Sequence, residues 1–149
     1  DLYCRSHGHA KTCYTRNVRE KEFINKVHKH LPKTIYRWKI NDPYHGGVPD
    51  TYYSGVGNHC WIEYKYTETL PARSTSKIKI NLSEQQRIWL NRQKSFNIFV
   101  YAVLACQDQV YVTEDFDTKY ITLEEFENKS IPFKDFVNGL TNFCLGEKE

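Results

Sequence analysis

Three residues with clear chemical potential are spaced along the middle of this chain: Asp50 and, thirteen residues later, Glu63 and Lys65. Residues 59–66, which surround the last two, read as a β-strand. Because side chains alternate between the faces of a strand, Glu63 and Lys65 point the same way and Tyr64 points the other way. If a hairpin returns Asp50 beside them, two carboxylates and an ammonium converge. Such a group could bind a divalent cation and position a water molecule for attack on a phosphate.

Hydrolysis of a phosphodiester needs an activated water, a Lewis acid on the phosphate and stabilisation of the leaving oxygen. Magnesium or manganese can supply all three when carboxylate oxygens hold it. We expect Asp50, Glu63 and the backbone carbonyl of Tyr64 to be the metal ligands. Lys65 would orient or deprotonate the water, or neutralise the charge that develops on the phosphate.

The segments before this pattern predict a helix and two strands. Asn17 is expected to cap a helix that Pro32 ends, with an apolar stripe at helical spacing. An acid of this helix, Glu22 or its neighbour Glu20, could add a further ligand. Alternation predicts strands over 34–40 and 50–54, and turns separate them from each other and from the strand at 59–66. The apolar stripe consists of Phe23, Ile24, Val27 and Leu31.

The segments after the pattern predict a loop, a helix and a buried strand. Residues 67–81 lack apolar periodicity and are expected to form a loop. Ser83 opens a helix, and Gln86 three residues later completes a capping box. The run 97–105 is the most hydrophobic of the chain and suits a central strand. Later segments predict a strand at 110–113 and two acidic helices, at 123–128 and 133–145.

This order predicts one α/β domain over residues 1–149, with a mixed central sheet flanked by helices. Residues 1–17 are expected to form an irregular arm, and residues 119–149 an acidic helical extension.

The pattern resembles the signature of the PD-(D/E)xK nuclease superfamily, in Pro49-Asp50 followed by Glu63-x-Lys65 on the next strand. The helix that begins at Ser83 is similar to one in the VRR-NUC and Holliday-junction-resolvase branches, where a Gln near the site corresponds to Gln86 or, alternatively, Gln85. Glu22 resembles the first-helix acid of those branches. The resemblance spans about residues 18–113 and implies a restriction-endonuclease-like core of order α-β-β-β-α-β, with Asp50, Glu63, Lys65, Glu22 and Gln86 as catalytic residues.

The resemblance also implies an activity and partners. It implies an endodeoxyribonuclease that uses Mg²⁺ or Mn²⁺ and cuts branched or structured DNA, with single-stranded DNA as a further candidate. Resolving a junction takes two cuts, so a homodimer is expected on that branch. RNA is a further possible substrate, and a phage origin would fit the compact size. The alternative from another class is a non-catalytic module on the same fold that binds nucleic acid or protein.

Charge along the chain is asymmetric. Residues 1–40 carry ten Lys or Arg and three acids, residues 41–104 seven and five, and residues 105–149 four and ten, within a net charge of +3. The basic residues 1–104 fit a polyanionic partner, and the acidic residues 105–149 argue against uniform non-specific binding of nucleic acid. Six basic residues are expected to contact the DNA backbone, unless they form an ordinary solvated face. These six are Arg73, Lys77, Lys79, Arg87, Arg92 and Lys94.

Aromatic and histidine side chains leave two interpretations open. Four aromatic residues could stack on splayed bases or pack in the core. Of the histidines, His28 is expected on the exposed side of the first helix. His45 and His59 could contact phosphate or have only a structural role, in a turn or at a strand end. The four aromatic residues are Trp38, Tyr52, Tyr53 and Tyr66.

The remaining composition bounds the environment. No stretch approaches the roughly 20 apolar residues of a membrane span, and no signal peptide is recognisable. Five cysteines in a scattered, odd set predict free thiols in a reducing, cytoplasmic compartment. Four N-terminal residues could hold zinc, although their spacing is uncommon for zinc and favours a tail without metal. They are Cys4, His7, His9 and Cys13.

Overall fold

The computed structural model describes residues 10–147, and side chains from residue 18 onward. Its elements along the chain are α1 (Ala10–His30), β1 (Tyr36–Lys39), β2 (Thr51–Ser54), β3 (His59–Tyr66), β4 (Lys77–Lys79), α2 (Glu84–Ser95), β5 (Val100–Cys106), β6 (Gln109–Thr113), β7 (Tyr120–Thr122), α3 (Leu123–Lys129), β8 (Ile131–Pro132) and α4 (Phe133–Leu145).

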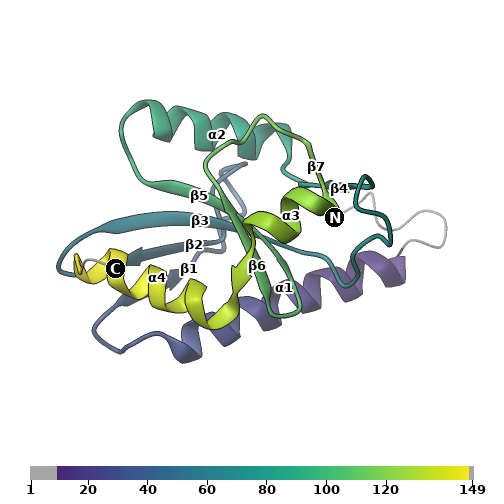
Figure 1. The fold of residues 1–149 in the computed structure, drawn as a ribbon. Helices are drawn as coiled ribbons and strands as arrows, with labels where there is room; N and C mark the ends of the chain where they lie inside the picture. Colours follow the sequence, from purple (N-terminus) through teal and green to yellow (C-terminus); the bar gives the residue numbers. More distant parts are fainter. Residues whose placement is uncertain (1–9, 148–149) are drawn as a thin grey trace.

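The main sheet has six strands in the order β1-β2-β3-β5-β6-β8. Its central pair, β3 and β5, is parallel, and every other pair in it is antiparallel. The parallel pair requires a crossover, which α2 supplies above the sheet in Figure 1. Helices α1 and α4 cover the opposite face, so the predicted mixed α/β architecture is confirmed.

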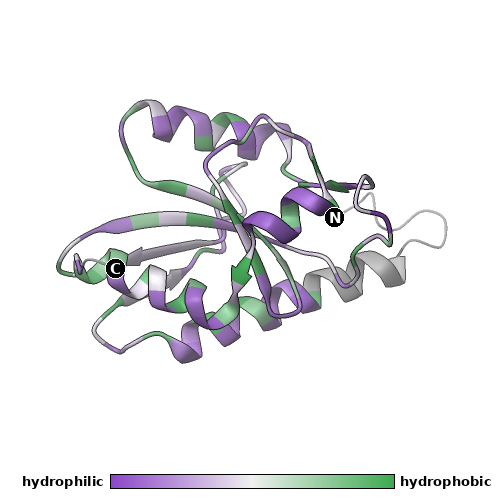
Figure 2. Ribbon diagram, viewed as in Figure 1, coloured by the Kyte–Doolittle hydropathy of each residue, from purple (hydrophilic) through white to green (hydrophobic). Residues whose placement is uncertain are grey.

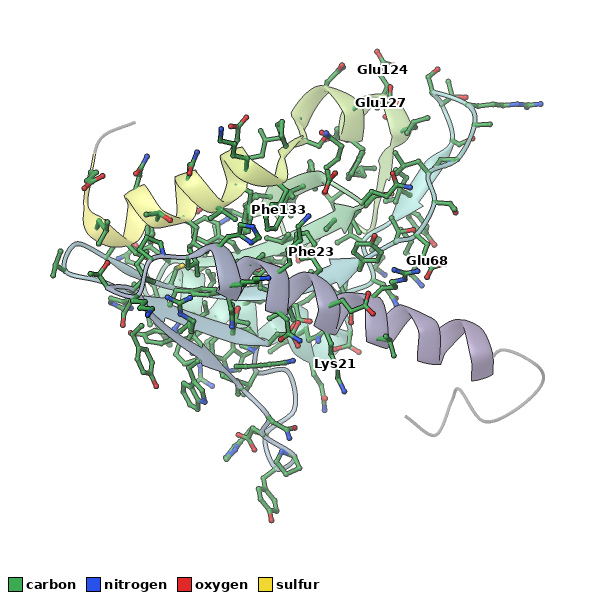
Figure 3. The ribbon with its side chains drawn as sticks, turned by 90° about the horizontal axis from the view of Figure 1, so that it is seen from below. Lys21, Phe23, Glu68, Glu124, Glu127 and Phe133 are labelled. Atoms are coloured by element: carbon green, nitrogen blue, oxygen red, sulfur yellow. The ribbon has the colours of Figure 1, made fainter. Side chains whose placement is uncertain are left out.

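The larger part of the core lies between the sheet and helices α1 and α4. Phe23 of α1 meets Tyr64 of β3 and Phe133 of α4, with ring centroids 5.9 and 5.7 Å apart. Figure 3 views the molecule from this side and shows Phe23 and Phe133 between the two helices. The apolar stripe predicted for the first helix is thus the buried face of α1, and green and purple segments alternate along both helices in Figure 2.

The α2 face of the sheet holds two smaller clusters. Leu90 of α2 packs with Val100 and Ala102 of β5. Further along the same face, β4 and β7 form a two-stranded antiparallel sheet whose Ile78 and Ile121 share a cluster with Leu104. Alternation puts Glu63 and Lys65 on this face too, because Tyr64 between them packs on Phe23.

Several predicted boundaries were wrong. Helix α1 begins at Ala10, so Asn17 lies inside the helix, and the irregular arm does not extend to residue 17. Strand β4 lies within the predicted loop 67–81, and β7 and β8 were not foreseen. Strands of two or three residues present too little alternation to be read, and they exist here because a distant strand pairs with them.

The described residues bear on two further predictions, that the cysteines are free thiols and that no segment spans a membrane. Cys60, Cys106 and Cys144 are buried free thiols. Cys4, His7 and His9 lie outside the described residues, and the side chain of Cys13 is likewise not described, so the zinc alternative stays untested. Within residues 10–147, no helix has both the length and the apolar character needed to cross a bilayer.

Candidate functional site

Strands β2 and β3 bring the two acids of the sequence pattern together. Thr51 pairs with Ile62 in an antiparallel register, so the preceding Asp50 lies opposite Glu63. The backbone N–H of Tyr64 donates a hydrogen bond to Asp50 Oδ2 at 3.0 Å. This contact holds the Asp50 carboxylate over the edge of β3, beside Glu63.

Glu63 is a buried acid with one unsatisfied oxygen. Only 2% of its surface is exposed. Lys65 Nζ lies 3.4 Å from Glu63 Oε2. Glu63 Oε1 has no hydrogen-bond partner among the described residues. A buried oxygen without a partner is costly, and a cation shared with Asp50 would supply that partner.

The environment of Glu63 disfavours its charge. Burial raises the pKa of Glu63 well above its usual range, and the nearby Asp50 carboxylate raises it further, whereas Lys65 opposes both effects without cancelling them. A cation between the two carboxylates would reverse this shift, because it favours both charged forms.

The carbonyl of Tyr64 is a plausible third oxygen at this point. In a strand, the N–H and C=O of one residue point to the same neighbour, so this carbonyl faces β2 as its N–H does. The residue opposite Tyr64 in the β2–β3 register is Pro49, which has no N–H to donate. The proline before Asp50 therefore leaves the Tyr64 carbonyl without a ladder partner from β2.

These donors suit a hard divalent cation. Magnesium and manganese take oxygen ligands, and magnesium commonly binds one or two carboxylates together with water and substrate phosphate. No group of three or more His, Cys, Asp or Glu side chains gathers as a metal site in the described part of the chain. The donor set is therefore two carboxylates and a carbonyl, which leaves coordination positions open for a substrate.

Behind the site, a hydrogen-bonded row of side chains on the α1 face fixes β3. The hydroxyls of Tyr64 and Tyr53 lie 2.8 Å apart, and His28 Nε2 lies 2.8 Å from the Tyr53 hydroxyl. Burial, followed by the charges of Arg37 and Lys39, lowers the pKa of His28 to about 4. His28 is therefore neutral at pH 7 and half-buried, which corrects the expectation of a solvated side chain.

The loop that carries Asp50 rests on the first turn of α2. A Cβ built on Gly46 would overlap the side-chain amide of Gln85, and one on Gly47 would overlap the Gln85 carbonyl. Gly47 also has φ +89°, in the left-handed region that favours glycine. This close approach sets the position of α2 relative to Asp50.

The side chain of Gln86 is engaged in the cap of α2. Ser83 Oγ accepts the Gln86 N–H at 3.1 Å, and Gln86 Oε1 accepts the Ser83 N–H at 2.9 Å. The predicted capping box is confirmed. Gln85, the alternative to Gln86, lies against the loop before Asp50.

Glu22 lies apart from the two carboxylates. Its side chain is 59% exposed and pairs with Arg19, which also reaches Glu68, seen beside α1 in Figure 3. Glu22 lines a shallow hollow with Tyr66, whose side chain points to the face of β3 opposite Lys65. The structure does not bring Glu22 to the α2 face.

Glu20, the competing choice, is the less exposed of the two acids on α1. It precedes Phe23 and Ile24 by three and four residues, so it continues their stripe toward the N-terminus of the helix. It is half-buried, whereas Lys21 points outward in Figure 3. Like Glu22, it therefore lies on the helix that packs against the face of the sheet opposite Asp50 and Glu63.

The six predicted DNA-contacting residues divide into two groups. Arg73, Lys77 and Lys79 are exposed around β4. On α2, Arg92 lies over Phe96 and Lys94 donates to the Glu114 carbonyl, so both are partly engaged. Arg87 is half-buried, and its Nε has no hydrogen-bond partner among the described residues.

The four aromatic residues named from the sequence separate onto two faces. Tyr53 is fully buried and Tyr66 packs on Phe23, both on the α1 face. Trp38 and Tyr52 lie on the α2 face, the face of the acids. Two further rings there were missed from the sequence, Trp61 and Trp89, with centroids 5.3 Å apart. Alternation within residues 59–66 was the signal available for Trp61.

Comparisons with known proteins give a coarse likeness. Neither a family model nor a curated protein sequence matches the chain. Solved structures do match, among them the Holliday junction resolvase Hjc of Archaeoglobus fulgidus, with a TM-score of 0.49 and 13% identity over 81% of this chain and 97% of that chain. At this similarity only the site itself bears on function.

Proposed function

We propose that the chain is a Mg²⁺- or Mn²⁺-dependent endodeoxyribonuclease of the PD-(D/E)xK type. The observation that carries this proposal is the Glu63 carboxylate, which is buried with one oxygen unsatisfied, beside Asp50 and Lys65. A structural ion pair would need neither the second acid nor the unsatisfied oxygen. A metal centre for phosphodiester hydrolysis needs both.

The roles follow from the atoms present. Asp50, Glu63 and the Tyr64 carbonyl would hold the cation, which would supply a Lewis acid and lower the pKa of a bound water. The Lys65 ammonium stays on the same face, where it orients the attacking water and offsets negative charge developing on the phosphate. Glu22 or its neighbour Glu20 would add an acid from α1, and Arg87 would offer its Nε to a phosphate oxygen.

The substrate and assembly belong to the same proposal. We expect branched or structured DNA, because Asp50 and Glu63-x-Lys65 resemble the signature of the junction-resolvase branch. Two cuts in a junction require two sites, which a homodimer would supply.

The first test is cleavage of plasmid and four-way-junction DNA in the presence of magnesium. We expect Asp50→Ala and Lys65→Ala each to lower the rate at least about 100-fold, in the range of a lost general acid–base or electrostatic group. Lys134→Ala is the matched control, because Lys134 is an exposed lysine on α4. Cleavage by either site variant at the wild-type rate would contradict the assigned roles.

Metal binding separates this proposal from its alternative, a non-catalytic module on the same fold. Calorimetric titration should show magnesium or manganese binding at millimolar concentration or tighter, lost in Glu63→Gln. The alternative predicts no metal binding and DNA binding that survives loss of Glu63.

A further inference from the structure

A row of aromatic rings crosses three strands on the same face as the two acids. Trp38 pairs with Tyr52, and Tyr52 pairs with Trp61, so the three side chains lie side by side on β1, β2 and β3. Ring centroids of Tyr52 and Trp61 are 4.7 Å apart, and those of Trp38 and Trp61 are 6.5 Å apart. We call these three residues, with Tyr36 beside Tyr52, the aromatic platform.

The aromatic platform is the row next to the acids. Tyr52 follows Asp50 by two residues on β2, and Trp61 precedes Glu63 by two residues on β3. Two residues along a strand amount to roughly 7 Å. A nucleotide whose phosphate lies at the two acids would therefore have a neighbour at the aromatic platform.

The rings at the outer end of the aromatic platform are open. Tyr36 is 58% and Trp38 47% exposed. At the other end of the row, Trp61 of β3 lies next to β5, which helix α2 covers. Trp89 of α2 packs against Trp61 and closes this end. Large rings side by side on a sheet face expose apolar surface that a ligand would cover favourably.

A hollow adjoins the aromatic platform at the loop before Asp50. It has a volume of about 530 Å³, and its walls include Trp38 and Trp61 together with Lys39 and Tyr44 of the neighbouring segment. Lys39 is exposed and cationic. Asp42 also lines the hollow, so its wall joins flat rings to charges of both signs.

We propose that the aromatic platform stacks unpaired nucleobases of single-stranded DNA beside the phosphate to be cut. The inference rests on the proposed function and narrows its substrate, since the bases of a duplex are stacked on each other and cannot reach the rings. Sheet faces that carry aromatic side chains bind single strands in this way, with little sequence preference. The DNA next to the cut would then be a single-stranded arm, gap or branch point.

The surroundings favour a single strand over a protein partner. The rings form a row that leads directly to the acids, and a protein covering it would also close the site. Occupancy by a second copy of this chain is kept as an outcome of the test.

The test measures binding without cleavage, in EDTA, by quenching of tryptophan fluorescence and by anisotropy of labelled DNA. Three probes of equal length are compared: a single strand, the same strand with abasic sites in place of its central bases, and the duplex. We expect the single strand to bind at least about tenfold more tightly than the abasic strand, since each stacked base contributes 1–3 kcal/mol. Equal affinity for these two probes would overturn the inference.

Variants locate the effect. Trp38→Ala should weaken single-strand binding about tenfold or more and leave duplex binding unchanged, whereas Trp38→Phe, which keeps a ring, should retain most of it. Phe99→Ala is the matched control, because Phe99 is 43% exposed but makes an edge-to-face contact with Phe143 of α4, on the other face of the sheet. Trp38→Ala with unchanged single-strand affinity would contradict the proposal.

Three further outcomes keep the two proposals separate. Sedimentation that shows a dimer broken by Trp38→Ala would assign the aromatic platform to self-association and overturn the stacking proposal. Loss of cleavage without loss of single-strand binding, as expected for Asp50→Ala, concerns the proposed function alone. Single-strand binding that depends on Trp38 in a protein that never cleaves would support stacking while refuting the nuclease.

Discussion

Glu63 shows how one side chain can oppose stability and serve a site. Its carboxyl is buried beside Asp50, with a pKa raised well above the usual range. Each pKa unit of such a shift reflects about 1.4 kcal/mol of preference for the neutral form. A buried glutamine or leucine would avoid this conflict, so the acid is best explained by what it binds.

His28 gives a prediction at the scale of one residue. Its pKa in the folded protein is about 4, below the usual value of 6.5, so the unfolded chain binds more protons between these values. The stabilisation from neutral His28 is full above pH 6.5 and is lost as the pH falls from 6.5 to 4. Because the ring is only half-buried, solvent screening limits the loss to about 1–2 kcal/mol.

Urea unfolding of wild type and His28→Gln between pH 7 and pH 5 checks this expectation. The wild type should lose stability over this interval, and the variant should lose less, because it lacks the titrating ring next to Tyr53. Parallel pH profiles for the two proteins would show that His28 does not titrate as described.

At the scale of elements, the contact between a loop and a helix positions the site. Residues 41–49 reach Asp50 by passing Gly46 and Gly47 over the Gln85 backbone and side chain. The capping box of Ser83 and Gln86 fixes the end of the helix that receives them. Asp50 is thereby held from two sides, by this loop and by the N–H of β3.

Gly47→Ala tests this contact. The substitution places a Cβ against the Gln85 carbonyl at a positive φ, so we expect a loss of stability of about 1–2 kcal/mol and a shift of Asp50 that weakens metal binding. Thermal unfolding and calorimetric metal titration measure both effects. Gly139→Ala, within α4, is the control, since alanine favours a helix interior and should not affect metal binding. Unchanged metal affinity in Gly47→Ala would refute the positioning role.

At the scale of the whole molecule, one face of the main sheet holds most of the core and the other face carries the candidate site. The α1 and α4 face holds the larger core and the row from His28 to Tyr64. The α2 face carries the acids, with the aromatic platform on one side and the basic residues of β4 on the other. Strand β4 lies on that side because its Ile78 shares a cluster with Leu104, which pairs with Lys65 in the β3–β5 register. Glu124 and Glu127 project from α3, where Figure 3 labels them.

This division predicts different responses to salt. Replacing Arg73 and Lys77 together by Gln should weaken binding of single-stranded and duplex DNA alike and reduce the salt slope of log K by roughly one to two, since each phosphate contact contributes about 0.7–0.9. Trp38→Ala should leave that slope unchanged. The measurement is anisotropy at several salt concentrations, with Lys134→Gln as the control. A slope equal to that of wild type would remove the two basic residues from the DNA interface.

Much of this organisation was readable from the sequence. Alternation put Glu63 and Lys65 on one face, the capping box marked the start of α2, and the apolar run predicted β5. These features depend on neighbours a few residues apart, whose side-chain directions are set by the strand or helix itself. The meeting of Asp50 with Glu63 followed from the turn between their strands.

Only the tertiary structure decided the rest. The burial of Glu63 with an unsatisfied oxygen and the row of rings across β1, β2 and β3 depend on which distant segments pack together and in what register. A change of one residue in register would turn every ring of that row to the other face. The sequence alone therefore determined which residues could do chemistry, and the packing of the sheet determined which of them meet.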